Sequence, residues 1–150
     1  MSAQAEILDE EGGWWNATNE ETAALETILF VEDEAFVREV TCEVLRSAGY
    51  RVVTVKNAAE AIREFDSKRG EVGLLLTDVV LPGENGRALA RRLRQADPEL
   101  RVLFVTGYAE QMGLSGTGYE ECLAKPFSTG VLLQRVKQMI NRGELQEVGA

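Results

Sequence analysis

Short apolar runs alternate with longer amphipathic stretches along most of this chain of 150 residues. The runs are rich in β-branched residues and have the length of buried strands, whereas the stretches between them carry apolar residues at helical spacing. Strands are predicted at 28–31, 51–55, 72–77, 102–106 and 121–125. Helices are predicted at 35–48, 58–67, 86–95, 109–115 and 128–142. This alternation predicts an α/β fold, a doubly wound five-stranded parallel sheet with five helices on its two faces.

Individual residues support the predicted helices. The first helix has apolar residues at helical spacing, namely Phe36, Val37, Val40, Val44 and Leu45. Gly49 is a stop signal for that helix, Asn57 is a cap for the next, and Asp97-Pro98 ends the third. The last helix is amphipathic, with an inward face of Leu132, Leu133, Val136, Met139 and Ile140.

The composition is that of a soluble globular domain, with 45% hydrophobic and 27% charged residues. No apolar run approaches the roughly 20 residues that a membrane span requires. The acidic start MSAQAEILDEEGG also lacks the basic and apolar blocks of a signal peptide. We therefore expect a cytoplasmic location and no membrane partner. Cys42 and Cys122 lie far apart without a CxxC pattern and are interpreted as reduced thiols.

The net charge of −9 is concentrated at the beginning of the chain. Residues 1–27 contain seven acidic residues and no Lys or Arg, which leaves a net charge of −2 for residues 28–150. Residues 1–26 are predicted to be a flexible acidic extension. The pair Trp14-Trp15 within it is interpreted as a loose patch or linker remnant rather than a docking or dimer contact. The net charge of −9 disfavours nucleic acid as a direct partner.

The residues that follow the predicted strands carry the candidate chemistry, because sites in open parallel sheets form outside the carboxyl ends of the strands. They are Glu32 and Asp33 after the first strand, Asp78 after the third, Thr106 at the end of the fourth and Lys125 at the end of the fifth. Clustered carboxylates need a divalent cation or a proton. Oxygen ligands in a chain without histidine favour Mg²⁺ or Mn²⁺. Each acid alone is typical of a solvated loop, but the combination favours a functional site.

The absence of histidine narrows the possible chemistry further. It excludes Ser-His-Asp triads, His-ligated zinc and any role as a phosphohistidine donor. A nucleotide-binding function is disfavoured because the chain has neither a GxGxxG nor a Walker-type glycine loop. The remaining chemistry must use carboxylates, lysine, hydroxyls, thiols and backbone groups.

Four motifs, in this order, resemble the receiver domain of bacterial two-component response regulators. They are VEDE (31–34), LLLTDVVLPGENG (74–86), LFVTGYAE (103–110) and LAKPF (123–127). The resemblance covers residues 27–142, which leaves 1–26 as the acidic extension and 143–150 as a C-terminal tail. It implies a flavodoxin-like sheet whose strands, numbered along the chain, lie in the order 2-1-3-4-5.

The resemblance implies a role for each acid at the strand ends. Asp78 would be the phosphoacceptor, a carboxylate nucleophile that forms an aspartyl phosphate. Asp33, Asp78 and the backbone carbonyl of Val80 would bind Mg²⁺ directly. Glu32 would act through a metal-bound water.

The resemblance also implies which groups would recognise the phosphoryl group. Lys125 would pair with Asp78 before the reaction and with the phosphoryl group afterwards. Thr106 would donate a hydrogen bond to the phosphoryl oxygens. A cis peptide bond between Lys125 and Pro126 would aim the lysine. Gly107 either leaves room for the incoming donor or is a plain turn glycine.

Three residues around the site are expected to modulate it. Val80 and Tyr108 flank the site and would tune the access of the hydrolytic water. Cys122 stands where many receivers carry a switch Tyr or Phe, and it is interpreted as a packing residue rather than a redox sensor. The segment FVTGY resembles a receiver subclass that works without this aromatic, and Tyr108 is the candidate substitute.

The implied function is a phosphoacceptor signalling domain that receives its phosphoryl group from a histidine kinase or phosphotransfer protein. It is not an enzyme with a separate substrate, because it would catalyse only its own Mg²⁺-dependent phosphorylation and dephosphorylation. Only NRGELQEVGA remains from the end of the last predicted helix onward, so we expect a stand-alone receiver. LETILFVEDE also resembles the junction before the receiver of a hybrid kinase. Output would pass to an unidentified protein, or through a homodimer, at the face of the fourth helix, fifth strand and fifth helix.

Other functions stay open at this point. The domain could be a phosphate relay or sink without output of its own, or an adaptor pseudo-receiver that is never phosphorylated. An aspartate-nucleophile phosphohydrolase is disfavoured, because it needs a second carboxylate two residues after the nucleophile and Val80 occupies that position.

Overall fold

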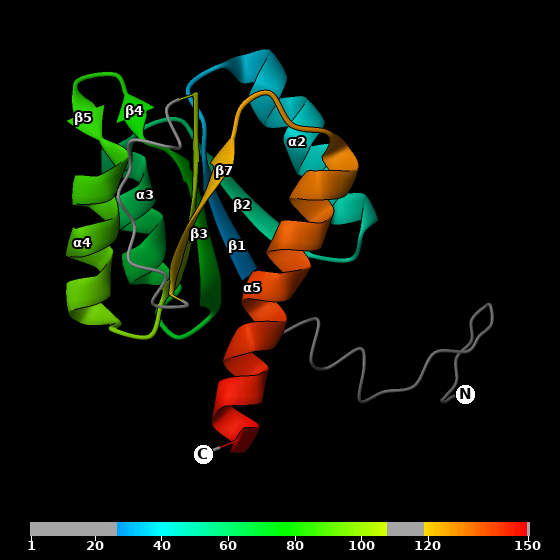
Figure 1. Cartoon of the computed structure of the whole chain (residues 1–150). Coiled ribbons are helices and arrows are strands. Elements are labelled where there is room, and N and C mark those ends of the chain that lie inside the picture. The colour runs from blue at the N-terminus through cyan, green and yellow to red at the C-terminus, as the bar shows by residue number, and fades with distance from the viewer. Residues whose placement is uncertain (1–26, 108–118, 150) are drawn as a thin grey trace, which may run out of the picture.

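The computed structural model describes residues 27–107 and 119–149, with residues 142–149 as backbone only. Its centre is a five-stranded parallel sheet in the order β2-β1-β3-β6-β7 (Figure 1). The strands are β1 (Thr27–Val31), β2 (Arg51–Val55), β3 (Val72–Asp78), β6 (Arg101–Thr106) and β7 (Glu120–Ala124). This is the predicted order 2-1-3-4-5, so the doubly wound, flavodoxin-like sheet is confirmed.

The central strands are apolar because both of their faces are covered. Every residue of β1 is buried, and β3 is buried at all positions except a half-buried Gly73. Successive residues of a strand point to opposite faces. Leu74 and Leu76 accordingly pack into one core, and Leu75 packs into the other. A continuous apolar run is therefore what this position in the sheet requires.

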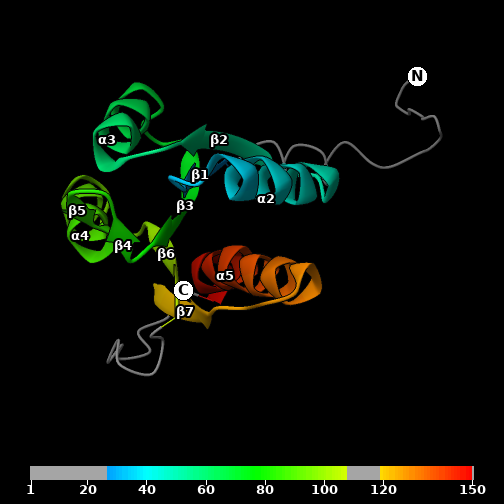
Figure 2. The ribbon, with the colours of Figure 1, turned by 90° about the horizontal axis from the view of Figure 1, so that it is seen from above.

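Four helices cover the sheet in the described residues, two on each face (Figure 2). They are α2 (Ala35–Ser47), α3 (Ala58–Ser67), α4 (Gly86–Ala96) and α5 (Thr129–Gly149). The pair α2 and α5 encloses a core that contains Leu45 and Met139, and the pair α3 and α4 encloses another that contains Phe65 and Leu93. The fifth predicted helix, at 109–115, lies outside the described residues. None of the helices in the described ranges is long and apolar enough to cross a membrane.

Two predicted helix boundaries are found in the structure, the cap at Asn57 and the stop at Gly49. The side chain of Asn57 accepts a hydrogen bond of 2.8 Å from the backbone N–H of Glu60, which caps α3 as predicted. Asn85 caps α4 in the same way, at 2.7 Å from the N–H of Arg87. Gly49 follows α2 in a left-handed conformation, with a φ of 103°, which favours glycine.

The first helix lies where it was predicted, but its apolar residues do not all face the core. Phe36 is 75% exposed, and Val37 and Val40 are also exposed, whereas Cys42 and Leu45 are buried. Helical spacing therefore predicted the helix correctly and its buried face only in part. Phe36, Val37 and Val40 are called the α2 apolar patch below.

Two local features differ from the sequence-based expectation. The segment after Asp78, for which no strand was predicted, forms a small antiparallel hairpin of β4 (Val80–Leu81) and β5 (Glu84–Asn85). The last helix continues past residue 142 to Gly149. The proposed boundaries of the extension, the receiver and the tail stay predictions.

The edge strand β7 is joined to a helix on each face of the sheet. Glu120 forms an ion pair of 3.1 Å with Arg94 of α4. The next residue, Glu121, forms one of 3.3 Å with Arg135 of α5. Because neighbouring residues of a strand point to opposite faces, the two pairs hold β7 from both sides.

Candidate functional site

The candidate site lies at the carboxyl edge of the sheet, where the ends of four parallel strands meet. Glu32 and Asp33 directly follow β1, Asp78 is the last residue of β3, Thr106 is the last of β6 and Lys125 directly follows β7. The parallel register brings these ends together, since Asp78 pairs with Val105 and Thr106 pairs with Ala124. The expected constellation is therefore assembled at one place in the fold.

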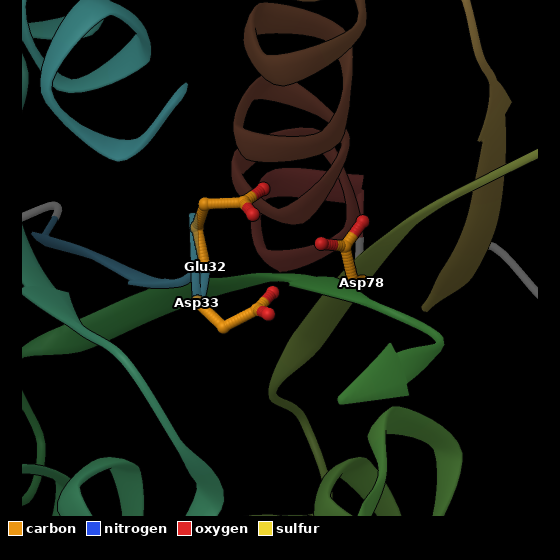
Figure 3. A group of neighbouring side chains, drawn as sticks. All are labelled: Glu32, Asp33 and Asp78. Carbon is orange, nitrogen blue, oxygen red and sulfur yellow. The ribbon is translucent and has the colours of Figure 1, made fainter. Parts of the chain in front are cut away.

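Three carboxylates form the centre of this site (Figure 3). Glu32, Asp33 and Asp78 each offer an oxygen, and these oxygens lie within 4.8 Å of one another. Glu32 is only 5% exposed and Asp78 only 7%, whereas Asp33 is exposed. Two buried acids so close to a third repel one another unless a cation or a proton joins them.

Lys125 supplies positive charge to the cluster. Its Nζ lies 2.8 Å from Oδ1 of Asp78. Burial alone would lower the pKa of Lys125, but the adjacent Asp78 carboxylate, together with Glu32 and Asp33, raises it. The lysine is therefore a permanent cation here, held at the site by the acids.

Glu32 has the most perturbed environment of the three acids. Burial, followed by the negative charge of Asp78, raises its pKa from 4.5 to about 7. A hydrogen bond of 3.1 Å from the backbone N–H of Glu34 to Glu32 Oε2 opposes this rise. Burial thus favours the protonated form of Glu32, and a bound cation would favour the charged form instead.

The residues present fit a hard divalent cation. Oδ1 of Asp78 is buried and faces the ammonium of Lys125, and a carboxylate has further lone pairs that a cation can share. The donor set of the three acids consists of oxygens alone, which suits Mg²⁺ better than softer metals. The structure thus supports the predicted type of metal site. The backbone carbonyl of Val80, the third predicted protein ligand, follows β3 in the hairpin strand β4.

The groups expected to recognise the phosphoryl group also lie at this edge. Thr106 is buried at the end of β6, and its carbonyl accepts a 2.9 Å hydrogen bond from the backbone N–H of Lys125. The peptide bond between Lys125 and Pro126 is cis, as predicted. Gly107 follows as an exposed turn residue.

The predicted modulating residues have different positions. Val80 is exposed on the hairpin next to Asp78. Cys122 is half-buried in β7 and packs against the core on the α3 and α4 side, and burial raises the pKa of its thiol. This position agrees with the packing interpretation. Tyr108 lies outside the described residues.

Gly86 is a site residue that the sequence analysis did not single out. It begins α4, and its N–H donates a 2.6 Å hydrogen bond to the carbonyl of Val79. A Cβ at this position would collide with the backbone carbonyl oxygen of Asp78. Only glycine lets the chain return so close to the end of β3. The signal in the sequence was the second glycine of PGENG, which reads as an ordinary turn residue.

The fold and the site define a doubly wound α/β protein whose sheet edge carries three clustered acids that could hold a metal ion, and a lysine paired with one of them. Residues 28–137 match the model of the response regulator receiver domain family. The chain belongs to this family and is a receiver domain of two-component signalling, as its four motifs indicated.

Two relatives of known name illustrate the likeness. The sensor kinase CckA of Brucella abortus is 37% identical over 119 residues, which span 77% of this chain and 13% of the kinase. The response regulator receiver protein CpdR of the same organism is 32% identical over 119 residues, 77% of this chain and 98% of CpdR. The match therefore spans nearly all of one relative and a small part of the other.

Solved structures show the same relationship. The receiver domain of the hybrid histidine kinase CckA aligns with a TM-score of 0.66 at 35% identity, covering 76% of this chain and 98% of that one. The response regulator TrrA of Thermotoga maritima, solved in complex with Mg²⁺ and BeF, aligns with a TM-score of 0.66 at 30% identity and the same coverage.

Proposed function

We propose that this receiver accepts a phosphoryl group on Asp78 from a phosphohistidine donor, with Mg²⁺ held by Asp33, Asp78 and the Val80 carbonyl, and by Glu32 through water. The observation that carries the proposal is the position of Asp78, a buried carboxylate with two more acids within 4.8 Å and a lysine ammonium at 2.8 Å. The neighbouring acids repel the charge of this carboxylate, and the lysine compensates it. Strongly perturbed carboxylates of this kind are typical of reactive groups. Mg²⁺, when bound, would neutralise the charge of the acids and of the phosphoryl oxygens.

The chain's own residues define the remaining steps. A carboxylate oxygen of Asp78 attacks phosphorus, the P–N bond of the donor breaks, and its electron pair returns to the imidazole of the donor. Lys125 moves its charge from the carboxylate to the phosphoryl oxygens, and Thr106 donates a hydrogen bond to them. The domain turns over no separate substrate, and water later cleaves the aspartyl phosphate. The lifetime of that phosphate would depend on Val80, Gly107 and Tyr108.

The α2 apolar patch is a candidate surface on which the phosphodonor protein docks. Receiver domains work with histidine kinases and phosphotransfer proteins. Val37 of the patch lines the same small cavity as Asp78 and Lys125, so a protein seated on the patch would reach the phosphoacceptor. Solvent-exposed large apolar residues beside a reactive group are typical of a protein contact. We expect the downstream partner also to be a protein.

The experiment that tests this function uses the full chain, Mg²⁺ and a small acyl-phosphate donor, with intact-mass measurement of wild type and Asp78→Asn. The expected result is a gain of one phosphoryl group in the wild type only. Loss of Mg²⁺ should abolish the gain. Wild type without any mass gain, and without a response to beryllofluoride, would support an unphosphorylated adaptor instead. Sustained release of phosphate from a phosphomonoester would support a phosphohydrolase.

A further inference from the structure

A groove with three arginines lies between α4 and the edge strand β7. It has a volume of about 320 Å³ and is lined by Arg87, Arg91, Arg94, Gln95, Phe104 and Glu120. The three arginines are spaced i, i+4 and i+7, which places them on one side of the helix. Helix α4 has the sequence GRALARRLRQA and contains no acidic residue. The groove is thus a concentration of positive charge in a protein of net charge −9.

Arg91 is the arginine of this groove that can accept a new carboxylate. The acid in its lining, Glu120, is engaged in the ion pair with Arg94. Arg91 is exposed, and no carboxylate of the described residues lies within ion-pair distance of it. Such a guanidinium can take a carboxylate as a bidentate partner. The groove is therefore suited to an acidic ligand.

Aromatic groups belong to the same region. The guanidinium carbons of Arg94 and Arg101 each lie 5.2 Å from the centroid of the Tyr119 ring. Phe104 contributes its ring to the lining of the groove. Arginines that already stack on one aromatic ring can accept another, and tryptophan is the best aromatic partner for a cation. A ligand that combines carboxylates with tryptophan would meet both features.

The chain itself carries a segment of this chemistry. Residues 1–27 hold seven acidic residues and no Lys or Arg. They also hold Trp14 and Trp15, the two tryptophans of the whole chain. The charge complementarity between this segment and the arginine groove is the central observation, because a segment without basic residues would meet a helix without acidic ones.

The segment can reach the groove. Strands β1, β6 and β7 are parallel, so they all begin at the same edge of the sheet. Their first residues are Thr27, Arg101 and Glu120. Three strand steps of about 4.8 Å separate β1 from β7, or roughly 15 Å. The residues from Trp15 to Thr27 can span up to roughly 40 Å when extended.

We propose that the acidic segment around Trp14-Trp15 docks in the arginine groove of its own chain. Its carboxylates bind Arg91, and an indole ring lies against a guanidinium. This assigns a ligand to the segment that the sequence alone favoured as a linker remnant. A short tether gives the segment an effective concentration of the order of millimolar, so even a weak contact is occupied. The docked segment would exclude other acidic ligands from this groove.

The test uses the fluorescence of Trp14 and Trp15, which reports on this segment alone because the chain has no other tryptophan. Quenching by acrylamide, a neutral molecule, is measured for the full chain and for a synthetic peptide of residues 1–26. Docking predicts a quenching constant at least twofold lower in the full chain. Salt at roughly 1 M shortens the Debye length to about 3 Å and should remove most of the difference. Equal constants for the chain and the peptide at low salt would overturn the proposal.

The helix offers a matched pair of variants. Arg91→Glu reverses a charge inside the groove, whereas Arg92→Glu reverses an exposed charge on the same helix that does not line it. Arg91→Glu should raise the quenching constant to that of the peptide, and Arg92→Glu should leave it unchanged. Equal effects of both variants would contradict docking in the groove. Protection of the tryptophans from acrylamide that rises with protein concentration would also overturn the proposal. It would mean that the groove binds the segment of a second copy of the chain. Far-UV circular dichroism checks that both variants fold.

Discussion

The ammonium of Lys125 lies 2.8 Å from Oδ1 of Asp78, and it faces a carboxylate cluster in which two of the three acids are buried. This pair connects the end of β3 with the end of β7, across the intervening strand β6. It therefore joins Asp78, the proposed phosphoacceptor, to the edge strand of the sheet. In the proposed reaction, the lysine of this pair would have to move its charge from Asp78 to the phosphoryl group.

Replacing Lys125 by methionine should destabilise the metal-free protein by about 1 kcal/mol, because it leaves Asp78 beside like charges without compensation. Loss of a partner from a fully buried pair costs about 3–5 kcal/mol, and the partial exposure of this lysine reduces that cost. Phosphorylation by a small donor should also slow at least tenfold. Urea unfolding and intact-mass kinetics measure the two effects.

A double-mutant cycle provides the control. Asp78→Asn removes the charge that Lys125 compensates, so Lys125→Met should cost much less in that background. Lys137→Met, at an exposed position of α5, should be neutral in both backgrounds. An equal cost for Lys125→Met with and without Asp78 would show that the ion pair does not stabilise the fold.

The stability of the metal-free protein should fall as the pH rises from about 4.5 to about 7. The raised pKa of Glu32 means that the native state binds more protons than the unfolded chain within this window. The stabilisation is complete below the unfolded pKa and is lost as the pH passes the folded pKa. The shift corresponds to about 3 kcal/mol. Glu32→Gln should flatten this slope, and Glu43→Gln at an exposed position should keep it. Parallel slopes for all three proteins would refute the assignment to Glu32.

Mg²⁺ should stabilise the protein, and more strongly at higher pH. The cation competes with the proton on Glu32, so its affinity should increase from about pH 6 to about pH 8. At a concentration of 100 times Kd the stabilisation should reach about 2.7 kcal/mol, and a chelator should reverse it. Asp33→Asn should abolish the response, whereas Glu34→Gln, next to it in sequence and exposed, should retain it. Thermal unfolding with and without Mg²⁺ distinguishes these outcomes.

Gly86→Ala should both destabilise the fold and impair phosphorylation. The added Cβ collides with the backbone carbonyl of Asp78, so either α4 or the end of β3 must move. Overpacking of this kind costs about 1–3 kcal/mol. Gly130→Ala is the matched control, because the nearest atom, Oγ of Ser128, would be 3.9 Å from its Cβ and alanine is the better helix former. A Gly86→Ala protein with wild-type stability and phosphorylation would show that the contact is not needed.

The strands and the site residues could be predicted because each depends on short-range sequence features. A strand buried on both faces must be apolar throughout, so runs such as those of β1 and β3 are recognisable. The ends of these runs then locate Asp78, Thr106 and Lys125 at one edge, since all strands are parallel. The cap at Asn57 is equally local.

Other features could not be predicted because they depend on contacts between distant segments. The spacing of Phe36, Val37 and Val40 is that of a buried face, yet no element of the described fold covers it. The burial of Glu32, and hence its pKa, follows from the packing around the end of β1. The requirement for glycine at position 86 arises only when α4 returns to β3. Each of these needs the assembled sheet.

The two ion pairs that hold β7 have a consequence for local opening of the structure. Edge strands exchange their amide hydrogens earlier than central ones, because fewer contacts must break. Lys125 directly follows β7, so any opening of this strand withdraws the lysine from Asp78. The bonds of Glu120 to α4 and of Glu121 to α5 thus protect the electrostatics of a site to which neither acid belongs. Weakening them should leave the global unfolding midpoint almost unchanged while the amides of β7 exchange faster.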